Sequence, residues 1–86
     1  MDRNTVVKIL KNESITLQEL NNFIISYTKH TLDKDISQVE LAAIAELIQS
    51  GIFNIGFAAE KAAKVLDISI TRVFSKDGNL LKTNIV

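Results

Sequence analysis

The chain contains one histidine, His30, and two carboxylates, Asp33 and Asp35, follow it closely. A histidine that is held by a carboxylate can act as a general base. A single histidine near the end of a helix is more often structural, because its cation interacts favourably with the helix dipole. We therefore expect no catalytic role for His30.

The same loop has part of the spacing of a calcium-binding loop. Asp33, Asp35 and Ser37 match its first three ligand positions, but Gln38 stands where the loop requires glycine. Ile44 occupies the place of the bidentate glutamate. The expected role of the segment is a polar connection that leads into a helix, and no metal site is predicted.

The residues that a phosphate-binding loop and thiol chemistry require are also missing. Gly51 and Gly56 have the spacing of the glycines in a phosphate-binding loop, but Phe57 and Ala58 follow where lysine and serine or threonine are required. The chain has no cysteine, which excludes disulfides, thiolate zinc sites and cysteine nucleophiles. We expect a protein that is not an enzyme, with no cofactor and no small-molecule substrate.

Length and composition indicate one small domain that spans residues 1–86. Its hydrophobic fraction of 47% is high for a chain with little interior, so part of the apolar surface is expected to meet a partner. Ten basic and ten acidic residues cancel, which disfavours a dedicated nucleic-acid binder. No signal-peptide pattern or apolar run of membrane-spanning length is present, so we expect a cytoplasmic protein without membrane contact.

Capping residues and glycines divide the chain into helices. The expected helices cover about residues 3–12, 17–30, 38–50 and 55–66. Asp2 or Asn4 can cap the first helix, Asn54 the fourth, and Gly51 can end the third in the left-handed conformation. Two capping boxes are predicted, Thr16 with Glu19 and Ser37 with Glu40, and each is combined with a hydrophobic staple, Ile15 with Leu20 and Ile36 with Leu41.

The fourth helix has an unusual composition. Its alanines, Ala58, Ala59, Ala62 and Ala63, form a nearly smooth side, which is typical of tight packing against another helix. Glu60 and Lys64 are spaced as an i,i+4 ion pair on the opposite side.

Residues 68–86 allow two interpretations. In the first, residues 68–75 alternate like a strand, Asp77-Gly78 forms a turn, and residues 80–86 return as a second strand. The open edge and apolar face of this hairpin would bind a protein partner. The partner-binding residues predicted on this interpretation are Ile70, Arg72, Phe74, Leu81 and Ile85.

In the second interpretation, residues 62–73, Ala-Ala-Lys-Val-Leu-Asp-Ile-Ser-Ile-Thr-Arg-Val, resemble the A-A-x-x-L-G-[VI]-S-x-x-T-[VL] pattern of helix-turn-helix DNA-binding modules. Asp67 departs from the glycine of the turn, and Lys76 stands where an apolar core residue is expected. The resemblance implies a recognition helix over residues 69–76. The DNA-binding residues that it implies are Lys61, Ser69, Thr71, Arg72, Ser75 and Lys82.

Together these patterns predict a mainly α fold, with four short helices in a compact orthogonal or bundle-like array and a C-terminal β-hairpin. The predicted function is that of a small non-enzymatic regulatory, inhibitor or adaptor protein. It would act by contact with a protein partner or with a second copy of itself in a homodimer. The alternative is a DNA-binding transcriptional regulator that uses a C-terminal helix-turn-helix or winged element.

Overall fold

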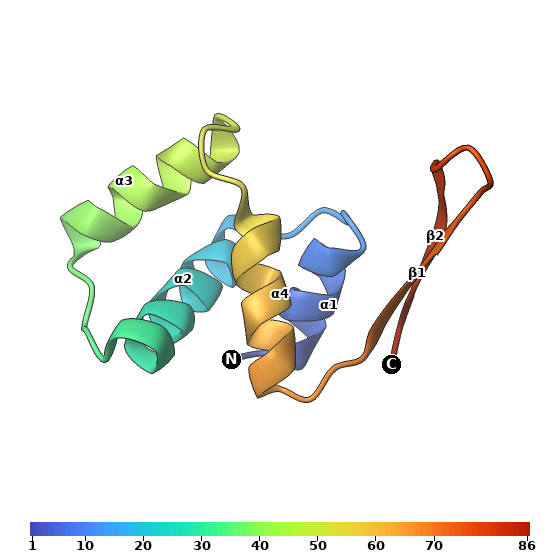
Figure 1. The fold of residues 1–86 in the computed structure, drawn as a ribbon. Coiled ribbons are helices and arrows are strands. Elements are labelled where there is room, and N and C mark those ends of the chain that lie inside the picture. Colours follow the sequence, from blue (N-terminus) through green and yellow to red (C-terminus); the bar gives the residue numbers. More distant parts are fainter.

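The computed structural model of the chain describes residues 1–86 as four helices followed by a two-stranded antiparallel hairpin (Figure 1). The helices are α1 (Arg3–Leu10), α2 (Leu17–Leu32), α3 (Gln38–Gln49) and α4 (Ile55–Val65), and the strands are β1 (Ile70–Phe74) and β2 (Leu80–Ile85). The predicted mainly α fold with a C-terminal hairpin is confirmed. The molecule is elongated, with extents of 46 × 27 × 20 Å, because the hairpin stands to one side of the helices.

Both predicted capping boxes are present. Thr16 Oγ1 accepts a hydrogen bond from the Glu19 backbone N–H at 3.0 Å, and Glu19 Oε1 accepts one from the Thr16 N–H at 2.9 Å. Ser37 and Glu40 make the equivalent pair of bonds at the start of α3, both at 3.2 Å. Each box satisfies N–H groups that have no partner within the helix, and this fixes where α2 and α3 begin.

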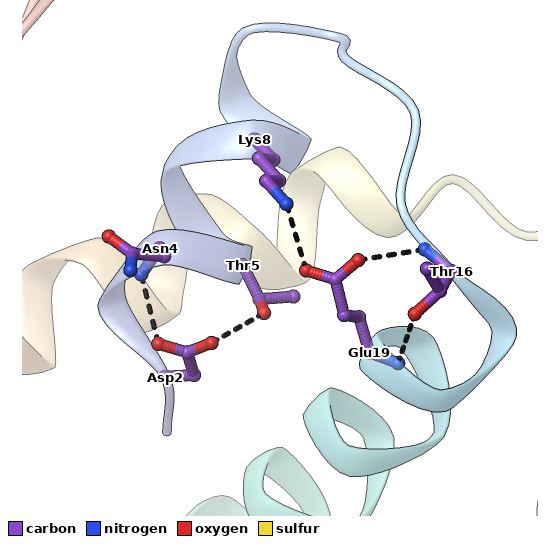
Figure 2. Close-up of polar contacts among 6 residues, drawn as sticks. All are labelled: Asp2, Asn4, Thr5, Lys8, Thr16 and Glu19. Carbon is purple, nitrogen blue, oxygen red and sulfur yellow. Dashed lines mark hydrogen bonds and ion pairs between the residues drawn. The ribbon is translucent and has the colours of Figure 1, made fainter.

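A polar network joins the first two helices (Figure 2). Asp2 caps α1 by accepting bonds from the Asn4 N–H at 3.1 Å and from the Thr5 hydroxyl at 2.9 Å. Lys8 of α1 donates to Glu19 Oε2 at 3.1 Å, while the other oxygen of Glu19 serves the capping box. The Thr16 N–H, and after it the Lys8 ammonium, hold the pKa of Glu19 below its ordinary value.

All four helices end with a residue in the left-handed conformation, and α2 does so at Asp33 with φ of +50°. Gly51 does so after α3 with φ of +82°, as predicted, and Asn12 and Asp67 do so after α1 and α4 with φ of +58° and +57°. After α1, α3 and α4, two backbone N–H groups return to carbonyls of the last turn, for example Ile68 N–H to Ala63 at 2.8 Å after α4. The helix α1 therefore ends at Leu10, earlier than predicted, because the turn around Asn12 closes it.

The core consists of two small clusters. The first joins α1, α2, α4 and the segment after α4, and its buried members are Val6, Phe23, Ala59, Ala62, Ala63 and Ile68. The second lies between α2 and α3 and contains Leu20, Ile24, Leu41 and Ala45. The staple residues Ile15 and Ile36 pack against the second cluster. The alanine side of α4 is thus an intramolecular contact, as predicted.

Ala59 tests how closely α4 packs, since it is 0% exposed. Ala59→Leu should lower the free energy of unfolding by about 1–3 kcal/mol, because added methylenes must displace neighbouring side chains. Urea unfolding of the variant measures the effect. Ala43→Leu, on the exposed side of α3, is the matched control and should change stability little. Equal stability of the two variants would contradict the packing described here.

Glu19 gives a pH dependence whose sign follows from its lowered pKa. The stabilisation of the folded state by the ionised Glu19 carboxylate is complete above the ordinary glutamate pKa of about 4.3. It is lost as the pH falls through the lower pKa that Glu19 has in the folded state. Glu19→Gln should therefore flatten the acid side of the stability profile, measured by unfolding across a pH series. Glu46→Gln, at an exposed glutamate whose side chain makes no bond, should leave the profile unchanged.

Candidate functional site

The C-terminal hairpin has a regular ladder and a glycine turn. Ser69 and Val86 exchange two backbone hydrogen bonds of 2.9 Å, and the register then pairs Ile70 with Ile85. Gly78 closes the turn with φ of +84°, its N–H bonding to the Ser75 carbonyl at 3.0 Å. Residues 70–74 are thus extended, as the hairpin interpretation predicts, and they form no helix.

Only one end of the hairpin is attached to the helices. Ile70 and Ile85 lie opposite one another and pack against the first core cluster. Arg72, on the same face two residues further along β1, forms an ion pair with Glu60 of α4. The predicted Glu60–Lys64 pair is wrong, because the carboxylate of Glu60 is turned towards the strand. We call Ile70, Arg72 and Ile85 the hairpin base.

The other end exposes apolar side chains. Phe74, Leu80 and Leu81 are 55%, 53% and 65% exposed, and we call these three residues the hairpin tip. The register shift next to Phe74 inserts one residue into β2 and places Leu80 opposite Phe74, so Leu80 joins that face. The structure therefore divides the predicted partner-binding set: Ile70, Arg72 and Ile85 contact the helices, whereas Phe74 and Leu81 face solvent.

Leu80 was missed by the sequence reading. A regular strand places residues 80 and 81 on opposite faces, and only the bulge brings both leucines to the tip. Asp77-Gly78 marked the turn, but nothing local in the sequence marks an extra residue in the ladder.

The residues predicted to bind DNA lie in several separate places. Ser69, Thr71 and Lys82 are exposed on the hairpin face opposite Arg72. Lys61 projects from α4 over the Phe57 ring, with its nitrogen 4.9 Å from the ring centroid. Ser75 lies at the turn and accepts a hydrogen bond from the Asn79 N–H at 3.2 Å, and the Arg72 guanidinium is paired with a carboxylate.

An apolar groove lies between α2, α3 and α4. It has a volume of about 250 Å³ and is formed by Phe23, Ile24, Tyr27, Thr28, Ile44, Ile48, Phe53, Asn54, Ile55 and Ala58. The rings of Phe23 and Tyr27 stack along one wall with centroids 5.8 Å apart. No charged residue lines the groove, so it offers apolar contact and no acid–base chemistry.

The His30 segment has a structural arrangement. Lys29 lies 3.4 Å from Asp33 and 3.7 Å from Asp35, so both carboxylates that follow His30 face this lysine. The His30 side chain makes no hydrogen bond or ion pair. Asp33 ends α2 in the left-handed conformation with φ of +50°. Nowhere in the molecule do three or more histidine, aspartate or glutamate side chains gather in a metal-binding arrangement.

Comparison with protein-family models, curated proteins and solved structures gave no match. The similarity of residues 62–73 to helix-turn-helix modules therefore rests on those residues alone. None of the four helices combines the length and the apolar character that a membrane-spanning helix needs.

The Arg72–Glu60 ion pair can be measured by a double-mutant cycle. The two side chains are 41% and 42% exposed, so their coupling should be small, about 0.2–1 kcal/mol. Arg72→Ala and Glu60→Ala should each lower thermal stability slightly, and the double variant should be less destabilised than the sum. Lys64→Ala is the control, and it should show no coupling to Arg72. Strict additivity of the Arg72 and Glu60 variants would contradict the pairing.

Proposed function

We propose that this chain is a small non-enzymatic regulatory, inhibitor or adaptor protein of the cytoplasm, and that it acts through protein–protein contact made by its C-terminal hairpin. The observation that carries the proposal is the uneven attachment of the hairpin. Its base packs on the helices, while its tip exposes Phe74, Leu80 and Leu81.

A two-stranded hairpin is marginally stable in water unless further strands or a helix cover it. Here the covering reaches only the base, and neither outer strand edge is paired with a further strand. Free edges bind strands of other chains by main-chain hydrogen bonds, and exposed side chains on one face then supply specificity. The hairpin has both features.

The chemistry of the surface supports contact over catalysis. The hairpin tip is apolar, and the groove between α2, α3 and α4 is lined by apolar side chains with Thr28 and Asn54 as its polar members. Large apolar side chains of this kind favour association when a partner buries them, because their surface is removed from water.

A tip variant tests the proposal. Phe74→Ser combined with Leu81→Ser should abolish capture of partner protein from an extract of the native host, because it removes the apolar area that the partner would bury. Phe57→Ser is the matched control: this phenylalanine of α4 is 65% exposed and lies outside the hairpin. Capture should persist in the control.

Two results would count against the proposal. Equal capture by the tip variant and the wild type would move the contact away from the hairpin. Salt-sensitive binding to host DNA that Lys82→Ala abolishes would favour a hairpin that acts as a wing on nucleic acid.

A further inference from the structure

The ladder determines which backbone groups of the hairpin point outward. Ser69 and Val86 exchange both of their backbone hydrogen bonds. Hydrogen-bonded and non-hydrogen-bonded pairs alternate along an antiparallel ladder, so Thr71 and Asn84 form the next hydrogen-bonded pair. The alternate pairs, Ile70 with Ile85 and Arg72 with Thr83, then direct their N–H and C=O groups away from the hairpin. Each strand therefore has an outer edge that can accept another strand.

Charge distinguishes the two edges. If two copies paired β1 with β1 about its central residue, Arg72 would lie directly opposite the Arg72 of the second copy, which is destabilising. The Arg72–Glu60 ion pair also places α4 on the β1 side of the hairpin. Pairing β1 with β2 of another copy would be heterologous and would build a ring or an open chain of subunits, with no closed pair of copies.

The β2 edge has no such conflict. Antiparallel pairing about Thr83 places Thr83 opposite Thr83 of the second copy, Leu81 opposite Ile85, and Lys82 opposite Asn84. No like charges meet, and threonine pairs and pairs of large aliphatic side chains favour antiparallel sheets. None of the side-chain hydrogen bonds or ion pairs involves Thr83 or Ile85.

The direction of the strands gives this arrangement a second consequence. In an antiparallel seam, the tip of one hairpin lies beside the base of the other. A two-fold axis at Thr83 also keeps the same hairpin face of both copies on one side of the sheet. The exposed tip residues Phe74 and Leu81 share the face of Ile70 and Ile85, which is the face that the helices cover. Each tip would therefore meet the helices of the other copy.

We propose that the hairpin binds a second copy of this chain, with the two β2 strands paired about Thr83 in a four-stranded sheet of order β1-β2-β2-β1. The proposal rests on the proposed function and names its partner. The new seam would be centred on the two main-chain hydrogen bonds that Thr83 exchanges with Thr83 of the second copy. It would supply both the additional strands that a lone hairpin lacks and a cover for its apolar tip.

A cysteine at the two-fold axis tests the register directly, because the chain has no cysteine of its own. Opposed residues in such a pair have Cα atoms about 5.5 Å apart, within the range that a disulfide spans. Thr83→Cys should therefore shift, on mild oxidation, to the mass of two chains in non-reducing electrophoresis. Thr71→Cys, an exposed threonine of β1, is the matched control and should run at the mass of one chain in the same electrophoresis.

Analytical ultracentrifugation of the unmodified chain completes the test. A mass that rises to that of two chains with concentration, together with selective cross-linking through residue 83, supports the dimer. A wild-type monomer at every concentration overturns it, and so does equal cross-linking of Thr83→Cys and Thr71→Cys. If the wild type is monomeric but host-protein capture still requires the tip, self-association fails while the proposed function stands.

Discussion

The contact between the alanine side of α4 and α1 is the constraint on which the rest of the structure depends. Ala59, Ala62 and Ala63 are almost fully buried, and their short side chains let the two helices approach closely around Val6. The same contact positions Ile68, which follows the left-handed turn at Asp67 and enters the same cluster. The hairpin begins directly after Ile68, so the packing of α4 determines where the hairpin base lies.

The small size of the chain explains why so much apolar surface stays outside this core. Only 11 of 86 residues are buried, although 47% of the sequence is hydrophobic. A short chain has little interior, and here that interior is divided between two clusters that share α2. The remaining apolar side chains are spread over the surface. Three form the hairpin tip and Phe53 lies in the groove beside α3, while others, such as Leu32 and Val39, are exposed elsewhere on the helices. The tip and the groove are apolar surfaces of the kind that suits contact with another protein.

The polar interactions act at the edges of this arrangement. The Glu19 network ties the start of α2 to α1. The Glu40 carboxylate ties Lys34 to the cap of α3, and its pKa is lowered by Lys34 and, after it, by the Ser37 N–H. The Arg72–Glu60 pair orients the base of the hairpin. Because these groups are partly exposed, they specify where elements begin and meet more than they add to stability.

The sequence by itself determined the features that depend on neighbouring residues. The capping boxes at Thr16 and Ser37, the left-handed Gly51 and the alanine side of α4 follow from contacts within a few positions, and all are present in the structure. The pattern of residues 69–76 suits both a helix and a strand, so only the tertiary structure decided between them. Pairing with β2 and packing of Ile70 on the core select the strand. The same holds for the exposed tip, the Arg72–Glu60 pair and the groove, because each depends on elements that are distant in the chain.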